Sequence, residues 1–208
     1  SPATGIVFAH SAGGLAKAYQ LAGAGGLSVV TEPEFFHGSL DLLRQAVDAT
    51  TLPVLAKDFV SIPKHLDLLY ENGADYALLI SEVFEQSLAL FSLTEAIEYA
   101  HGLGLQVLLE THSRKQFENA LDTKADVIGV NNRNLRDLSL NTLHYQTILE
   151  KNREYHKPVI VESGFQTPAD LIKAKEFGAS GAIVGTALLS SENVFTTAKK
   201  LVESVSLK

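Results

Sequence analysis

The feature that most constrains the fold is a regular alternation of short apolar runs with amphipathic stretches along the whole chain. Runs that are apolar almost throughout are typical of parallel strands buried on both faces, and the intervening amphipathic stretches are typical of the helices that cover such a sheet. The expected strands are Leu27–Val30, Pro53–Lys57, Tyr76–Ile80, Gln106–Glu110, Val127–Asn131, Val159–Ser163 and Gly181–Gly185.

The stretches between these runs have the apolar spacing of helices. The expected helices are Gly14–Ala22, Ser39–Asp48, Ile62–Glu71, Leu93–His101, Arg114–Leu121, Thr142–Glu150, Pro168–Phe177 and Asn193–Val205. Three of them are followed by Gly23, Gly73 or Gly178 immediately before the next strand. A glycine at this place supplies the left-handed conformation that ends a helix, so the pattern indicates repeated β–α units.

The fold class that this pattern favours is α/β, specifically a (β/α)8 TIM barrel. A doubly wound open sheet is the alternative, but no nucleotide-type glycine-rich turn follows any strand. Eight expected helices accompany seven expected strands, and the chain opens on a helix. We therefore expect the first barrel strand to lie upstream of Ser1, so that residues 1–208 form a single, N-terminally incomplete catalytic barrel domain.

Composition excludes several classes of partner. The 208 residues are 46% hydrophobic and 20% charged, and no linker-like segment divides them, which is ordinary for one soluble domain. A net charge of −7 with scattered lysines and arginines argues against nucleic acid and anionic membranes, whereas a small phosphorylated substrate remains compatible. With no cysteine, no signal peptide and no apolar span, we expect a cytoplasmic protein without disulfides or thiolate metal sites, and we take a monomer as the working expectation.

Polar side chains close four of the expected strands. Lys57 ends PVLAK, Glu110 ends QVLLE, Asn131 ends VIGVN, and Glu162 and Ser163 end VIVES. Each alone is explained by a chain leaving the core for water. In a barrel, however, the carboxyl ends of the strands meet at one mouth, where a cation and carboxylates shift one another's pKa values. Their convergence predicts a site for general acid–base chemistry.

Glycines and aromatic residues suggest how a substrate would be held. Gly164 and Gly185 follow the last two strands, where the backbone of a barrel commonly binds phosphate, although Gly185 is also explained as a tight turn. Phe35 and Phe36 follow the first expected strand and fit either core packing or stacking on an aromatic ring. The sequence leaves both alternatives open.

The histidines do not have the spacing of metal ligands. Glu110 and His112 alternate correctly on one strand, but no third ligand accompanies them, and no P-loop or G-x-S-x-G motif is present. We therefore expect no metal.

Four short motifs occur in order along the chain: KDF (57–59), GVNNRNL (129–135), ESG (162–164) and VGTAL (184–188). In this order and spacing the chain resembles the indole-3-glycerol-phosphate synthase family over nearly its whole length. The resemblance implies a carbon–carbon lyase that needs no cofactor. Its members convert 1-(2-carboxyphenylamino)-1-deoxyribulose 5-phosphate to indole-3-glycerol phosphate in tryptophan biosynthesis, by ring closure, decarboxylation and dehydration.

The resemblance also implies catalytic roles for the residues at the strand ends. Lys57 would be the general acid at the ribulose carbonyl, and Glu110 would be the acid–base group of the dehydration. Asn131, Glu162 and Ser163 would orient the substrate and these two groups.

By the same resemblance, Gly164, Gly185 and Thr186 would hold the phosphate. Phe36 would pack on the anthranilate ring, and Arg133 would lie near its carboxylate.

The chain departs from the family pattern at its start. The resemblance makes Ser1 and Pro2 part of a substrate-binding loop, but the family's glutamate and second lysine, which precede that motif, are not in this sequence. Two alternatives remain. A barrel like phosphoribosylanthranilate isomerase would share the glycine phosphate loops but would not need KDF and ESG together. A catalytically impaired barrel that binds a phosphorylated ligand is favoured only by the missing first-strand residues.

Overall fold

The computed structural model describes residues 11–206 and contains one seven-stranded sheet. Every strand pairs in parallel with the next one along the chain, in the order β1 to β7. The strands are β1 (Leu27–Val30), β2 (Val54–Lys57), β3 (Tyr76–Ile80), β4 (Gln106–Thr111), β5 (Val127–Asn131), β6 (Val159–Glu162) and β7 (Gly181–Ile183).

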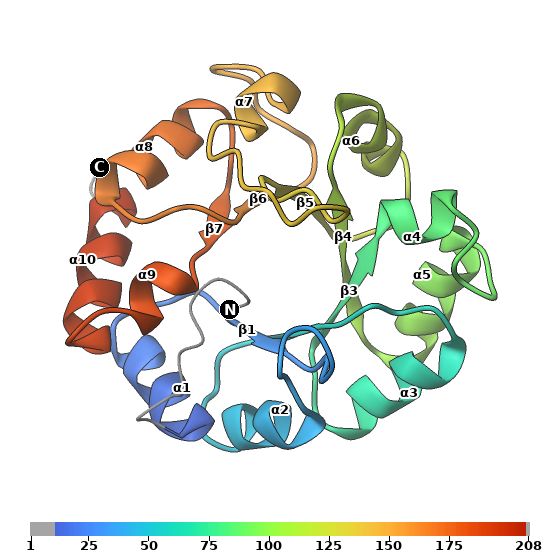
Figure 1. Cartoon of the computed structure of the whole chain (residues 1–208), viewed down its shortest axis with the longest axis horizontal. Helices are drawn as coiled ribbons and strands as arrows, with labels where there is room; N and C mark the ends of the chain where they lie inside the picture. Colours follow the sequence, from blue (N-terminus) through green and yellow to red (C-terminus); the bar gives the residue numbers. More distant parts are fainter. Residues whose placement is uncertain (1–10, 207–208) are drawn as a thin grey trace.

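The sheet curls into a nearly closed ring, as Figure 1 shows. This sequential order confirms the TIM barrel and contradicts the open alternative, because a doubly wound sheet reverses its strand order at a switch point. Strands β1 and β7 are the two edges, and within residues 11–206 they do not pair with each other. We call the gap between these two edges the seam.

Helices surround the sheet on its outside (Figure 1). Helix α1 contacts α10, so the helical layer continues across the seam. The helices are α1 (Ala12–Leu21), α2 (Leu40–Val47), α3 (Pro63–Glu71), α4 (Ser81–Glu85), α5 (Leu93–Leu103), α6 (Arg114–Leu121), α7 (Tyr145–Ile148), α8 (Pro168–Glu176), α9 (Thr186–Leu189) and α10 (Val194–Ser206).

Local signals in the sequence explain where several helices begin and end. The side chains of Ser92 and Thr167 cap α5 and α8, each within a reciprocal capping box. The predicted terminators Gly23, Gly73 and Gly178 have φ angles of 87°, 85° and 83°. The prediction that left-handed glycines close these helices is therefore confirmed.

Two sequence-based boundaries were wrong in an informative way. The helix expected at Thr142–Glu150 is only the four-residue α7, because the amide N–H of Tyr145 donates to the side chain of Asn132 and the preceding segment follows the loop. The short helices α4 and α9 were not predicted, since neither is long enough to show a periodic pattern.

The core has two parts. A small apolar cluster fills the inside of the barrel, and a larger one lies between the strands and the helices. The inner cluster is built on Leu55, Leu78, Ile80, Val83 and Leu108. It fills the barrel as a packed interior, so polar chemistry is confined to the carboxyl ends of the strands.

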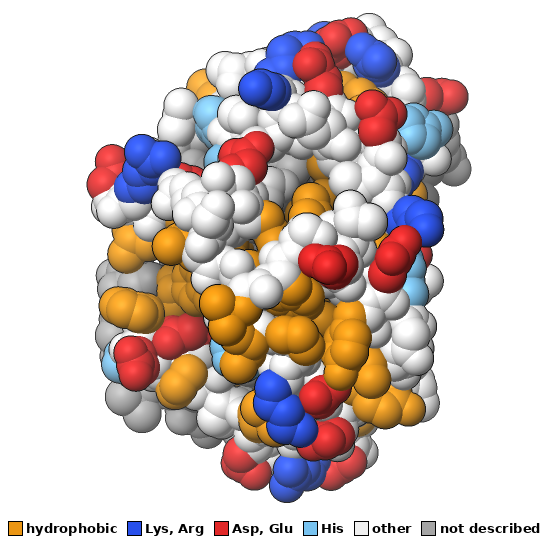
Figure 2. All heavy atoms as spheres, turned by 90° about the vertical axis from the view of Figure 1, so that its right-hand side faces the viewer, with side chains coloured by type: hydrophobic (Ala, Val, Ile, Leu, Met, Phe, Trp, Pro, Cys, Tyr) orange, Lys and Arg blue, Asp and Glu red, His pale blue; other side chains and the backbone are white. Residues whose placement is uncertain are grey.

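The outer surface mixes charges of both signs. On the face shown in Figure 2, basic and acidic side chains lie beside one another around an apolar area. Lys64 of α3, for example, lies 3.6 Å from Asp67 and 3.7 Å from Glu71. Among the described residues, no helix is both long and apolar enough to span a bilayer.

Candidate active site

A lysine held between two carboxylates lies at the carboxyl end of the barrel. Lys57 Nζ is 2.7 Å from Oε2 of Glu110 and 3.0 Å from Oε2 of Glu162. The three residues come from β2, β4 and β6, which are alternate strands. Alternate strands of a TIM barrel contribute side chains to the same interior layer, which explains why residues so distant in sequence converge.

Burial makes the electrostatics of this cluster strong. The side chains of Glu110 and Glu162 are 1% and 2% exposed, and that of Lys57 is 28% exposed. Burial alone lowers the pKa of Lys57, but the charges of Glu110 and Glu162 outweigh it and raise that pKa well above its usual range. The lysine therefore remains protonated at neutral pH.

The two carboxylates respond in opposite directions to the same surroundings. Burial raises the pKa of Glu162 to about 7, an effect that Lys57 only partly offsets and that the charge of Glu110 reinforces. Burial also acts to raise the pKa of Glu110, but Lys57, followed by His112, outweighs it and keeps that pKa well below its ordinary value. One carboxylate is thus firmly ionised, while its neighbour exchanges a proton near neutral pH.

Gly129 of β5 makes room for this arrangement. A Cβ added to it would lie 2.6 Å from Oε1 of Glu162 and 2.7 Å from Cδ2 of Leu108. These separations are too short for a side chain, so the position of the Glu162 carboxylate depends on a glycine on the neighbouring strand.

Asn131 and Asn132 organise the loops after β5 and β6. Asn131 is buried, and its Oδ1 accepts a hydrogen bond of 2.9 Å from the amide N–H of Arg133. Asn132 Nδ2 donates to the carbonyl of Ser163 at 2.9 Å. Ser163 has a φ of 67°, and Gly164 follows it at 86°. Asn132 therefore secures a turn that a non-glycine residue such as Ser163 rarely adopts.

The other predicted phosphate-loop residues lie at the rim. Gly185 is exposed and precedes the first residue of α9, Thr186. A Cβ at Gly185 would meet no atom of residues 11–206 within 4 Å. The backbone around Gly185 is therefore open to a ligand, whereas a Cβ at Gly164 would lie 2.7 Å from the side chain of Thr142.

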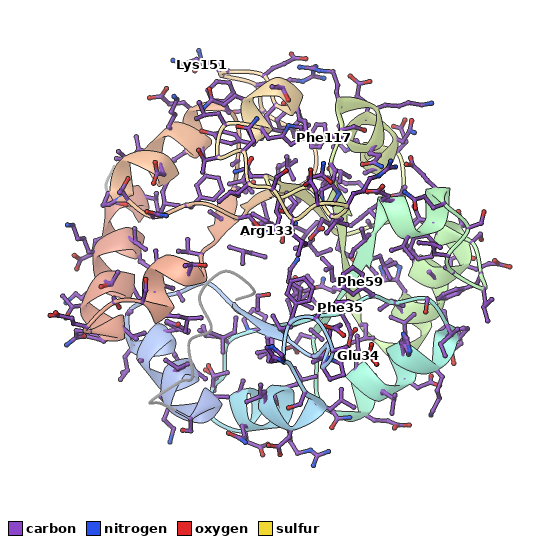
Figure 3. All side chains as sticks on the ribbon, in the orientation of Figure 1. Glu34, Phe35, Phe59, Phe117, Arg133 and Lys151 are labelled. Atoms are coloured by element: carbon purple, nitrogen blue, oxygen red, sulfur yellow. The ribbon has the colours of Figure 1, made fainter. Side chains whose placement is uncertain are left out.

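Aromatic side chains and Arg133 approach the mouth from different loops. Figure 3 shows Phe35 and Phe59 near the centre of the ring of strands, with Arg133 on the β5 side. The Phe36 and Phe59 rings are 6.1 Å apart and tilted by 41°. Arg133 Nη1 donates to the carbonyl of Leu138 at 2.7 Å.

The loop that carries Phe35 and Phe36 is folded around one carboxylate. Glu32 is buried directly after β1 and accepts hydrogen bonds of 2.8, 2.8 and 2.9 Å from the amides of Glu34, Phe35 and Phe36. This role could not be predicted from the sequence, because a carboxylate after a strand has no distinctive spacing.

A cavity lies beside the cluster of Lys57, Glu110 and Glu162. This cavity of about 490 Å³ is bounded by α4, the start of α6 and the segment after β5. Asn131 and His112 line it together with polar residues that include Arg133, Arg136 and His144. It is therefore a side cavity next to the three charged residues, which themselves do not line it.

The structure brings together four of the residues selected from the sequence, whereas Phe36, Arg133, Gly185 and Thr186 lie in separate loops around them. Lys57, Glu110 and Glu162 touch one another, and Asn131 lies in register with Glu162 on the adjacent strand. Ser1 and Pro2, predicted to bind substrate, lie outside the described residues. Sequence reasoning missed structural contributions from Glu32, Phe59, Gly129 and Asn132, and it considered His112 only as a metal ligand.

The barrel and its lysine–carboxylate cluster define the general class, that of TIM barrels with ionisable side chains gathered at the carboxyl ends of their strands. Within this class the chain belongs to the indole-3-glycerol phosphate synthase family, whose family model matches residues 1–201.

Individual relatives agree with this placement. The chain is 35% identical over 180 residues to an indole-3-glycerol phosphate synthase of Bacillus cereus (strain AH187), covering 86% of this chain and 70% of that protein. It is 36% identical over 176 residues to the enzyme of the same name from Staphylococcus aureus (strain JH1), covering 85% and 66%. A solved structure titled "Native KDPGal structure" superposes with a TM-score of 0.63 at 17% identity, covering 98% of this chain and 93% of that one, and supports the fold alone.

Proposed function

We propose that this protein is a carbon–carbon lyase that converts 1-(2-carboxyphenylamino)-1-deoxyribulose 5-phosphate to indole-3-glycerol phosphate in tryptophan biosynthesis. The observation that carries the proposal is the Lys57 ammonium held between two buried carboxylates at the mouth of a barrel of this family. A protonated lysine beside an ionised and a neutralisable carboxyl group supplies both the acid and the base that the reaction needs.

In the first half of the reaction, Lys57 acts on the ribulose carbonyl. The ring carbon that bears the carboxylate attacks the carbonyl carbon, and Lys57 gives a proton to the oxygen as its negative charge develops. The bond to the carboxylate then breaks, and its electron pair restores the aromatic ring as carbon dioxide leaves. The carboxylates support this step because they keep Lys57 protonated until the oxygen accepts its proton.

In the second half, Glu110 removes water. Its ionised carboxylate takes a proton from the carbon next to the ring nitrogen and passes it to the hydroxyl group, which leaves as water. The negative carboxylate of the substrate departs as neutral carbon dioxide, so each turnover takes up one proton from solvent. That proton restores Lys57, and Glu162, whose pKa is about 7, is placed to transfer it.

The rim residues would hold the ends of the substrate. The space beside Gly185, which no described residue fills, suits a phosphate group, with Gly164 and Thr186 next to it. Arg133 would bind the anthranilate carboxylate, and Phe36, with Phe59 against it, would pack on the aromatic ring. Asn131 and Ser163 would orient the ribulose chain between these ends. A phosphorylated small molecule is thus the proposed partner, with no cofactor and no metal.

The test follows the appearance of indole fluorescence after the carboxyphenylamino-deoxyribulose phosphate is added. We expect turnover by the parent and a loss of about 10³-fold in Lys57→Met, because the acid is removed. Lys64→Met is the matched control, since Lys64 pairs with Asp67 and Glu71 on the surface of α3. Binding of substrate without turnover by the parent would instead favour an impaired ligand-binding barrel. Isomerisation of phosphoribosylanthranilate would favour the isomerase alternative.

A further inference from the structure

One oxygen of Glu110 is not accounted for by the cluster. Oε2 accepts the hydrogen bond from Lys57, but Oε1 is buried and has no hydrogen-bond partner among the described residues. Nε2 of His112 lies 3.3 Å from this Oε1 atom. Neither ring nitrogen of His112 has a hydrogen-bond partner among residues 11–206. Buried polar atoms left in this way are uncommon and call for a functional explanation.

We propose that His112 is a positioning residue for Glu110, whose Oε1 it holds through Nε2–H so that Oε2 stays on Lys57. The inference rests on the proposed function, because it concerns the carboxylate that acts in the dehydration. A small rotation of the ring aligns the 3.3 Å contact, and catalytic hydrogen bonds are often poorly aligned before substrate binds.

The backbone of His112 is fixed from two sides. Its amide N–H donates to Oε1 of Gln116 at 2.8 Å, and its carbonyl contacts Nε2 of His144 at 2.8 Å. Gln116 in turn donates to Glu85 of α4 at 2.7 Å. The imidazole is therefore placed beside Glu110 by contacts from α6 and from the segment before α7, and those contacts do not depend on Glu110 itself.

The charges around the pair are mixed. Lys57 and Glu162 face Glu110 from β2 and β6. On the cavity side, His112 shares its lining with Glu82 and Glu85 of α4, and with Arg133, Arg136 and His144 after β5. His112 acts directly on Glu110 from this cavity side, where it helps Lys57 to lower the pKa of Glu110 against the effect of burial. Its loss should therefore raise the pKa of Glu110.

The variants are His112→Ala, His112→Gln and, as a control, His156→Asn. His156 lies just before β6, at the opposite end of the barrel from the cluster, and its Nε2 contacts the carbonyl of Leu121 at the end of α6. We expect kcat to fall about tenfold or more in His112→Ala with KM nearly unchanged, because a misplaced catalytic group loses rate more than binding. The acid limb of its pH–rate profile should move to higher pH. His112→Gln, which keeps an N–H donor, should retain a rate within about threefold of the parent.

Imidazole supplies a second measurement. His112 lines a cavity of about 490 Å³, so free imidazole can reach the space left by alanine and should restore part of the rate. Thermal unfolding of each variant identifies any that fail to fold, and His112→Gln then carries the test.

The outcomes are distinct. If His112→Ala loses rate but its acid limb does not shift and imidazole does not restore activity, His112 has a merely structural role and the inference is overturned. An unchanged rate in His112→Ala would also overturn it. Absence of turnover in the parent would instead refute the proposed function.

Discussion

Two regions of the barrel contrast in how their polar groups are held. In the wall formed by β4 to β6, most strand residues are buried, and the carboxylates of Glu110 and Glu162 both contact the Lys57 side chain of β2 directly. In the loops that follow β7 and β1, the prominent features are backbone groups, at Gly185 and around Glu32. The comparison teaches that reacting groups lie where packing fixes them, whereas the groups suited to holding a ligand lie where the backbone is accessible.

The largest effect that would sharpen this comparison is expected for Glu162→Gln. In the parent, folding raises the pKa of Glu162 from 4.5 to about 7, so the folded state loses stability as pH rises through this interval. Glutamine removes that loss. The free energy of unfolding of the variant relative to the parent should therefore increase by about 3 kcal/mol between pH 4.5 and pH 7.

Urea unfolding at a series of pH values measures this difference. Glu176→Gln is the control, because Glu176 is a partly exposed partner of Lys151 on the helix layer. A difference between Glu162→Gln and the parent that stays flat with pH would show that Glu162 does not titrate as described.

Gly129→Ala tests the packing of the wall. Its Cβ would overlap the Glu162 carboxylate and Leu108, so we expect a loss of about 2–3 kcal/mol in the free energy of unfolding. Turnover should fall as well, because Glu162 would be displaced from Lys57. Chemical denaturation and the fluorescence assay measure the two effects, and a stable, fully active variant would contradict them.

Glu32→Gln tests the seam side of the mouth. A glutamine cannot accept all three amide hydrogen bonds that the carboxylate accepts, so we expect a loss of about 1–2 kcal/mol. Thermal unfolding measures it, with Glu34→Gln as the control because Glu34 is exposed in the same loop. KM should rise more than kcat falls, since the loop carries the aromatic residues. Equal melting temperatures for the two variants would show that Glu32 does not stabilise the loop.

Gly185→Ala should produce the smallest change in stability. A Cβ there meets no atom of the described part of the chain within 4 Å, so the free energy of unfolding should stay within about 0.5 kcal/mol of the parent. A large destabilisation measured by the same denaturation would show that the seam is as tightly packed as the wall and would break the contrast.

Much of the fold follows from local signals in the sequence. Apolar runs and left-handed glycines such as Gly73 specify where strands and helices alternate, because they act over a few residues. The length of α7 could not be predicted in the same way. It depends on Asn132, which binds the amide of Tyr145 and replaces a turn of helix with a loop.

The site residues also divide into those that the sequence could predict and those that it could not. Lys57, Glu110 and Glu162 could be selected because they end strands, and closure of the sheet brings alternate strands to one layer. The need for glycine at position 129 could not be predicted, because it arises from the side chain of Glu162 on the neighbouring strand. Contacts fixed by register across the sheet have no signature within a single strand.

The close approach of Glu162 to Gly129 also has an evolutionary meaning. The two positions cannot change independently, since any side chain at 129 occupies the space of the Glu162 carboxylate. A shorter acid at 162 relieves one of the two clashes made by a Cβ at 129, the other being with Leu108, so Gly129→Ala combined with Glu162→Asp should be more stable than the sum of the separate changes implies. Diverging members of such a lineage would be expected to exchange these two residues as a pair.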